Sequence, residues 1–366
     1  MAAMCQKRHR FFEPRQTPIN NESIETKSAE KIASHIKLWY DVTVQKVEKI
    51  FNKLKVSPNI HEAVLYIENT KGDFSQSYGH GGRDINSPMI MASITKMFTT
   101  TCLLKLCEQK KLSLDDKINI DGLSSELTVS HLLFQTSGLP DYFSDKNSSI
   151  GWQSIIEQDR EITLDESLAE TKRLGPKFAP SNKKAFYSDI NYELLGMILV
   201  KASGLALDAL FKKFIFEPLG MSGTFLPGMD SVVPHSYYKD KKFARAKYMA
   251  SCGAASGGCV STPKDLMKFS KAFWGGQLFD KKWLGTIADY KRVFGPIYYG
   301  GGHMRFGVGW LTNFRARGYM VGHSGFTCSF MYYYPHKDLH FVGDLSQCQN
   351  PAASTRLLLK LAVAVR

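Results

Sequence analysis

Apolar positions recur at two different spacings near the start of this 366-residue chain. Between residues 28 and 55 they return every three to four positions, which predicts an amphipathic helix of several turns. A short apolar run at 63–67, turn-forming residues at 69–73 and a second run at 74–78 predict a β-hairpin. Residues 1–27 are polar and basic, and they predict an N-terminal tail.

The middle of the chain has a helical pattern broken by glycine and proline. Residues 91–106 are uncharged apart from two lysines and largely apolar, which predicts a buried helix with Ser93 near its start. A helical and loop-rich stretch is predicted to follow, to about residue 295. The period then shortens: 306–314, 319–323, 329–334 and 339–345 are predicted strands, and 351–366 a closing helix.

Strands from both ends of the sequence would pair into one antiparallel sheet, which predicts an α+β fold. This sheet would be flanked by N- and C-terminal helices and interrupted by a large helical insertion lobe. The α+β lobe would comprise about 28–92 and 296–366, within a catalytic domain of 28–366. The helical lobe would comprise about 93–295, with a cleft between the lobes.

Composition narrows the class of protein. The net charge is +13, but Lys and Arg are spread along the chain, so a solvated surface is expected and no nucleic-acid partner. A nucleic-acid-binding module is the distant alternative, and it predicts affinity that falls steeply with salt. No run approaches the roughly 18 apolar residues of a membrane span.

The N-terminus lacks an apolar signal region. The chain has seven Cys and no Cys-x-x-Cys motif, which suggests that the cysteines are reduced thiols. We therefore expect a cytoplasmic protein, although one exported by another route would look the same.

The candidate chemistry begins with Ser93 and Lys96. Ser-x-x-Lys places both side chains on one helix face, where an amine can assist loss of the serine proton. The motif occurs six times in the chain, but only this pair lies in an apolar segment, where a lysine needs a partner or a role. The alternative is that Lys96 extends to the surface.

The segment 92–96 resembles the nucleophile motif of class C β-lactamases, low-molecular-weight penicillin-binding proteins and related esterases. Five further segments resemble motifs of that superfamily in the same order, between about residues 60 and 345. They are 112–116 (LSLDD), 132–140 (LLFQTSGLP), 187–192 (YSDINY), 257–262 (GGCVST) and 323–325 (HSG). The resemblance implies a β-lactamase/transpeptidase-like fold.

The resemblance also implies roles for individual residues. Ser93 would form an acyl-enzyme, and Tyr187 would act as general base together with Lys96. The alternative for Tyr187 is a buried, structural tyrosine. His323 would line the substrate side of its strand. Backbone N–H groups of Ser93 and of Phe326, just after Ser324 and Gly325, would form the oxyanion hole. No cofactor or metal is implied, and His131 is expected to be structural.

Two positions depart from the β-lactamase pattern. Asp189 stands in place of Asn, and it would pair with Lys96 and hold it charged. Lys96 would then act mainly by favouring the Tyr187 phenolate. The loss of the amide donor predicts weaker activity on acylamino β-lactams. His323 stands in place of Lys and is expected to be largely neutral near pH 7, which predicts a relaxed requirement for a substrate carboxylate.

The first hypothesis is therefore a serine hydrolase of esterase or peptidase type, acting on a small ester, amide or peptide. A β-lactamase or D-alanyl-D-alanine carboxypeptidase is the second, with the same acyl-enzyme chemistry. An acyltransferase, a penicillin-binding sensor without turnover and an inactive scaffold are further alternatives. The natural substrate, the oligomeric state and the role of the tail stay open.

Overall fold

The computed structural model describes residues 41–365. Contacts divide the chain into two units, Met1–Lys46 and Val47–Arg366. Residues 41–55 are helical, so this part of the predicted helix over 28–55 is confirmed. The predicted tail, 1–27, and residues 28–40 lie outside the described residues. The proposed division into lobes near residues 93 and 295 stays a prediction.

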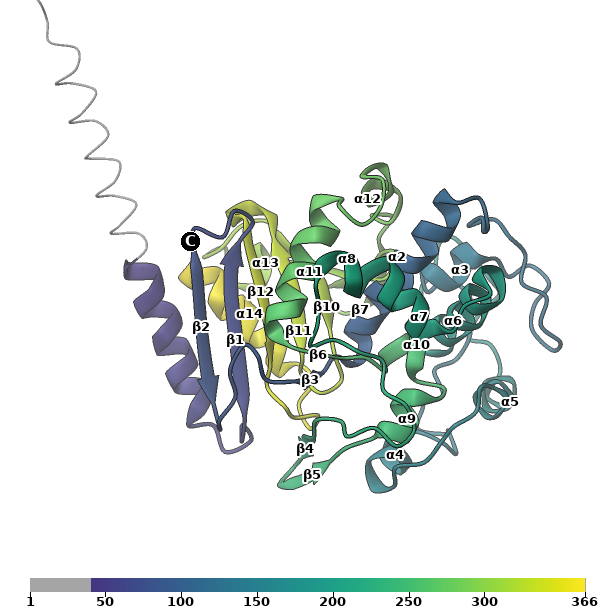
Figure 1. Cartoon of the computed structure of the whole chain (residues 1–366), viewed down its shortest axis with the longest axis horizontal. Helices are drawn as coiled ribbons and strands as arrows, with labels where there is room; N and C mark the ends of the chain where they lie inside the picture. Colours follow the sequence, from purple (N-terminus) through teal and green to yellow (C-terminus); the bar gives the residue numbers. More distant parts are fainter. Residues whose placement is uncertain (1–40, 366) are drawn as a thin grey trace, which may run out of the picture. The chain divides into compact units, whose positions relative to one another are not determined.

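The second unit is built on an eight-stranded sheet in the order β2-β1-β12-β11-β10-β9-β8-β7, with antiparallel neighbours throughout (Figure 1). Strands from the two ends of the sequence meet where β1 pairs with β12. The predicted fold class is confirmed. The strand bounds are β1 Ala63–Asn69, β2 Ser75–His80, β7 Lys291–Phe294, β8 Ile297–Tyr299, β9 Met304–Gly307, β10 Tyr319–Ser324, β11 Phe330–Tyr334 and β12 Leu339–Asp344. Two further pairs lie outside this sheet: β3 Met89–Ile90 with β6 Val260–Ser261, and β4 Ser236–Tyr238 with β5 Lys241–Phe243.

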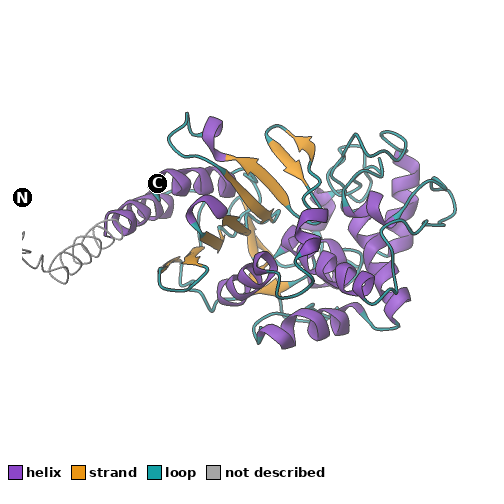
Figure 2. Ribbon diagram, turned by 90° about the horizontal axis from the view of Figure 1, so that it is seen from above, coloured by secondary structure: helices purple, strands orange, loops and turns teal. Residues whose placement is uncertain are grey.

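Both faces of the central strands are covered by other parts of the chain. Every residue of β12 is buried, which an alternating strand with one solvated face would not show. The helix α11 (Pro263–Gly275) packs against β1, β11 and β12, and Figure 2 shows helices on both sides of the strands. The C-terminal helix α14 (Ala353–Ala364) agrees with the predicted closing helix.

One predicted strand is wrong over most of its length. The segment 306–314 was expected to be extended, but β9 ends at Gly307 and the short helix α13 (Val308–Leu311) follows. Thr312 explains the turn, because its hydroxyl donates to the carbonyl oxygens of Val308 and Gly309 and accepts from Ala316 N–H. The hairpin of β7 and β8 was not expected, since its strands are only four and three residues long.

The helix α2 (Thr95–Glu108) packs against α6 (Ile190–Ser203) and α10 (Ala254–Gly257). Nearly all of α2 is buried, as its apolar sequence predicts. The other α-helices are α3 Val129–Leu133, α4 Trp152–Glu157, α5 Leu164–Leu174, α7 Leu207–Phe211, α8 Glu217–Leu219, α9 Ala246–Ala250 and α12 Lys282–Thr286. The short 3-10 turns are Ala92–Ile94 and Pro335–Lys337, and Lys212–Phe216 is a π-helical turn.

Within residues 41–365, no single helix has both the length and the apolar character needed to cross a membrane. The pair Ile190–Ser203 and Leu207–Leu219 reaches that length and composition only together, and it is bent by 81°.

Candidate active site

Ser93 lies in the single 3-10 turn that leads into α2. Ala92, directly before it, has a φ of +45°, a left-handed conformation that residues with a Cβ seldom adopt. The adjoining Met91 is held by two hydrogen bonds: its N–H donates to Cys259 O (3.0 Å), and its carbonyl accepts from Ser329 Oγ (2.9 Å). Backbone strain that the surroundings maintain is concentrated at functional sites, so this turn suits a reactive Ser93.

Lys96 is fully buried (0% exposed) and makes three hydrogen bonds. Its Nζ donates to Ser93 Oγ (3.1 Å), Asp189 Oδ1 (2.6 Å) and the carbonyl oxygen of Ser256 (2.7 Å). These bonds use all three ammonium protons. The expected ion pair with Asp189 is confirmed, and the alternative that Lys96 extends to the surface is wrong, because its charge is paired inside the protein.

Tyr187 lies beside Lys96, with its ring centre 5.1 Å from Nζ. Burial and the nearby Asp189 carboxylate raise the pKa of Tyr187 well above its ordinary value, while a hydrogen bond with Ser93 opposes the rise. The resting side chain is therefore a neutral phenol. A role as base requires the phenolate, which Lys96 favours and Asp189 opposes, and this role stays a prediction.

The loop matched as LLFQTSGLP holds the Tyr187 segment in place. Gln135 accepts hydrogen bonds from Phe186 N–H (2.8 Å, at its backbone oxygen) and from Ser188 N–H (2.9 Å, at its side chain). Ser137 Oγ donates to Asn191 Oδ1 at 2.6 Å. Distant parts of the sequence are thereby brought together so that Tyr187 meets Ser93 and Lys96.

His323 lies beside Tyr187, and its predicted role of lining the substrate side of its strand stays a prediction. It is fully buried (0% exposed), with its ring centre 6.0 Å from that of Tyr187 and 5.9 Å from that of Tyr299. Its Nδ1 donates to the Ser324 carbonyl at 2.8 Å, and Nε2 has no hydrogen-bond partner among the described residues. Burial, reinforced by the Lys96 charge, lowers the pKa of His323 to about 3, so its expected neutrality near pH 7 is supported.

The turn between β10 and β11 packs against the backbone that precedes Ser93. Gly325 N–H donates to Ser329 O at 2.7 Å, and Thr327 Oγ1 donates to Ile90 O at 3.4 Å. A Cβ on Gly325 would lie 2.1 Å from Ser329 Oγ and 2.6 Å from Met91 O, so only glycine fits here. Phe326 follows in this turn, which brings the two predicted oxyanion-hole residues, Ser93 and Phe326, onto adjoining segments.

A second buried network lies behind Lys96 and was missed in the sequence. Ser256, whose carbonyl accepts from Lys96, donates through its hydroxyl to Glu193 Oε1 (3.4 Å). Glu193 also accepts from Tyr142 Oη (2.6 Å) and Cys252 Sγ (2.7 Å), and its burial raises its pKa to about 8. The sequence did contain a signal for this network: Glu193 is the one acidic residue in the apolar helix α6. A charged residue in an apolar segment also singled out Lys96.

Partly exposed aromatic rings surround the candidate residues. Phe294 has its ring centre 6.1 Å from that of Tyr187. Phe326, in the turn between β10 and β11, packs against Phe143 (5.3 Å) and Trp152 (5.8 Å). The candidate residues therefore have apolar rings as neighbours.

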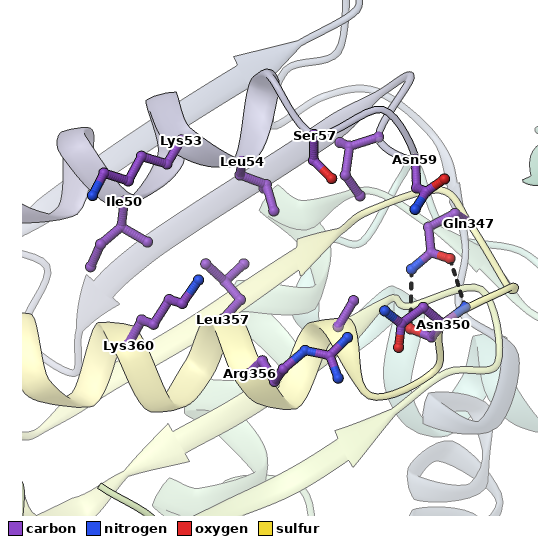
Figure 3. A pocket seen from close by; sticks show the side chains of 12 residues that line it. Ile50, Lys53, Leu54, Ser57, Asn59, Gln347, Asn350, Arg356, Leu357 and Lys360 are labelled. Atoms are coloured by element: carbon purple, nitrogen blue, oxygen red, sulfur yellow. Dashed lines mark hydrogen bonds between the residues drawn. The ribbon is translucent and has the colours of Figure 1, made fainter.

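Two other features of the described chain lie outside the group around Ser93: His131 and a surface groove. His131 forms a capping box with Thr128 at the start of α3, as expected of a structural residue. A groove of about 270 Å³ lies between residues 50–60 and α14 and contains none of the candidate residues (Figure 3). Within the described part of the chain, no group of three or more His, Cys, Asp or Glu is placed to hold a metal ion.

The chain belongs to the Beta-lactamase family, whose model matches residues 64–364. It is 28% identical over 265 residues to penicillin-binding protein 4* of Bacillus subtilis (strain 168), covering 66% of this chain and 56% of that protein. It thus spans little more than half the length of that relative. The family resemblance seen in the sequence is confirmed.

Two solved structures share the fold. The D-amino acid amidase from Ochrobactrum anthropi SV3 complexed with D-phenylalanine gives a TM-score of 0.73 at 21% identity, over 88% of this chain and 99% of that one. EstCE1, a hydrolase with promiscuous acyltransferase activity, gives a TM-score of 0.71 at 17% identity, over 89% and 99% of the two chains.

Proposed function

We propose that this protein is a serine hydrolase that cleaves an ester or amide through an acyl-enzyme on Ser93. The observation that carries the proposal is the buried Lys96 ammonium, bonded to both Ser93 and Asp189, beside the Tyr187 ring. A buried lysine that bonds both a half-buried serine and a carboxylate is the kind of arrangement found at functional sites.

In the proposed reaction, Ser93 Oγ attacks the substrate carbonyl and passes its proton to the Tyr187 phenolate. The N–H groups of Ser93 and Phe326 would bind the developing oxyanion. Tyr187 would return the proton to the leaving alcohol or amine, and water would then release the acyl group from Ser93. Because the phenolate is a minor form at neutral pH, the rate should rise with pH.

The substrate is proposed to be uncharged near the reacting carbonyl, with an apolar acyl group. The rings of Phe294 and Phe326 favour an apolar group, and a neutral His323 offers no cation to a carboxylate. The names of the structural neighbours, an amidase and a hydrolase, agree with this class. A β-lactamase or D-alanyl-D-alanine carboxypeptidase uses the same chemistry and remains the alternative, as does acyl transfer, the side activity named for EstCE1.

A cytoplasmic location and a small-molecule substrate as the main partner are also proposals. The six cysteines of residues 41–365 are free thiols, which agrees with a reducing compartment.

The test is a substrate panel: a p-nitrophenyl ester, a cephalosporin and a D-Ala-D-Ala peptide. We expect ester hydrolysis to exceed turnover of the cephalosporin, and Ser93→Ala to lose about a thousandfold or more of it. Ser181→Ala is the matched control, because Ser181 opens another Ser-x-x-Lys in a polar loop. Activity that survives in Ser93→Ala would overturn the proposal, and faster hydrolysis of the cephalosporin would favour the alternative.

A further inference from the structure

Large aromatic side chains are exposed on one part of the described chain. The most exposed are Trp310 (73%) and Phe314 (74%), and they lie in the loop between β9 and β10. Three others, Phe294, Tyr298 and Tyr319, belong to neighbouring strands. Phe294 borders the candidate active site, but Trp310 and Phe314 have no part in it. Two large exposed aromatic side chains four residues apart in one loop form a candidate contact surface.

The loop 308–318 is held in one conformation by its own hydrogen bonds. Val308 N–H donates to Gly318 O (3.0 Å), and Phe314 N–H donates to Gly309 O (2.7 Å). Asn313 and Phe314 both have positive φ, +50° and +59°. Such a conformation is unfavourable for phenylalanine, and it presents the ring to solvent. The strained backbone at Phe314 does not place its ring in the core, because the side chain is exposed. This suggests that the conformation serves to present the ring at the surface.

The stretch of sequence that contains the loop is basic. Between Asp289 and Asp338 it has six Lys or Arg and no further Asp or Glu, and the exposed Arg315 and Arg317 belong to the loop itself. Arg305 lies over the Tyr319 ring at 4.6 Å. The short helix α13 packs against α14, whose Arg356 and Lys360 line the groove of Figure 3 together with Lys53.

We propose that the loop 308–318 docks on an anionic lipid surface, with Trp310 and Phe314 entering the interface and Arg315 and Arg317 meeting the headgroups. Tryptophan is favoured at membrane–water interfaces, and each basic residue near an anionic surface adds to the attraction. A second copy fits poorly, because a symmetric contact would oppose arginine to arginine. A nucleic acid is a poorer candidate than a lipid surface. Proteins that bind single strands provide a basic groove along the sugar-phosphate backbone, whereas this loop offers only two rings at its tip. Attachment through this loop would hold the hydrolase at a membrane surface.

The test measures co-sedimentation with vesicles of phosphatidylcholine alone and of phosphatidylcholine with phosphatidylglycerol. The wild type should bind the anionic vesicles, and added salt should weaken binding. Trp310→Ala/Phe314→Ala should abolish it, and Arg315→Ala/Arg317→Ala should lower the partition coefficient about 30-fold. Lys241→Ala/Lys242→Ala is the control, because it removes the same charge from the exposed hairpin of β4 and β5.

A fluorescence measurement reports the loop directly. The emission of the wild type should shift to the blue on anionic vesicles, and Trp310→Phe should bind without this shift. Hydrolysis of a soluble ester should be unchanged in all these variants, which separates the result from the proposed catalytic function. The proposal is overturned if the wild type binds neither vesicle, if the aromatic variant binds equally, or if the loop variants instead lose a dimer or an oligonucleotide complex.

Discussion

At the scale of single residues, the ion pair of Lys96 and Asp189 sets the chemistry of the site. An ammonium with three acceptors has no lone pair and cannot take the Ser93 proton. We therefore propose another group as the base, and Tyr187 is the candidate because its ring lies beside Lys96. Asp189 makes this harder, because its charge opposes the phenolate. The departure from asparagine at position 189 is thus predicted to change the working pH of the enzyme as well as its substrate range.

The substitution Asp189→Asn tests this reasoning. Asparagine keeps an oxygen that accepts from Lys96 but removes the negative charge that raises the pKa of Tyr187. The phenolate dominates above that pKa, so lowering the pKa should move the alkaline rise in kcat/KM for a neutral ester to lower pH. The exposed Asp208→Asn, which only breaks a surface pair with Lys212, should leave the profile where it is. A profile of Asp189→Asn that is unchanged or moves to higher pH contradicts this account.

The substitution His323→Lys tests the role of a neutral residue at that position. A lysine would supply the cation that His323 lacks, so we expect kcat/KM for a substrate acid, relative to its methyl ester, to rise about tenfold. The ratio is measured because a buried lysine will also lower stability. His323→Gln, which stays neutral, should keep the wild-type ratio. A wild type that already prefers the acid strongly would refute the hypothesis.

The sequence singled out the candidate catalytic residues but not the residues that hold them in place. Ser93 and Lys96 stood out because a lysine in an apolar helix needs a partner, and the family motifs added Tyr187 and His323. The burial of His323 was not predictable, because it depends on rings from β8 and the Tyr187 segment. The contact of Ser256 with Lys96 was not predictable from residue type, because it uses the backbone oxygen of Ser256.

At the scale of elements, two contacts position the start of α2. The β10–β11 turn packs on the backbone before Ser93, and the loop that enters β9 packs on α2 itself. Gly302 in that loop has a φ of +83° and lies against Thr100, one turn beyond Lys96.

The substitution Gly302→Ala should therefore destabilise the protein. Its Cβ would lie 2.0 Å from Thr100 Oγ1, in a conformation that alanine avoids, and we expect a loss of about 2–4 kcal/mol in the free energy of unfolding. Gly307→Ala is the matched control, since a Cβ there meets nothing within 4 Å and its φ is −76°. Urea denaturation measures both. Equal stability of the two variants would show that this contact does not hold the loop on α2.

Elements with a clear period were predicted, and those set by local hydrogen bonds were not. The strands β1, β10, β11 and β12 are rich in apolar residues and lie close to their expected bounds. The helix α13 replaced a predicted strand because Thr312 and two residues of positive φ turn the chain. The β7–β8 hairpin is too short for a period to show.

At the scale of the whole molecule, the packing of distant helical segments against one another buries several ionisable groups. Glu193 is one of them, with a pKa raised to about 8 from an ordinary 4.5. Between these two values the folded state keeps a proton that the unfolded chain releases. Its contribution to stability is therefore full below about pH 4.5 and is lost as pH rises toward about 8.

The substitution Glu193→Gln should remove this dependence, because glutamine stays neutral. Relative to the variant, the wild type should lose on the order of a few kcal/mol of unfolding free energy between about pH 5 and about pH 8. Urea denaturation across this range gives the difference. A constant difference across the range would mean that Glu193 titrates normally.

The central claim is that Ser93 is the nucleophile, and the most direct measurement is mass spectrometry after reaction with a fluorophosphonate. The account predicts one adduct per chain, on the peptide that contains Ser93, absent from Ser93→Ala and retained in Ser181→Ala. An adduct on another residue, or equal labelling of Ser93→Ala, would contradict it.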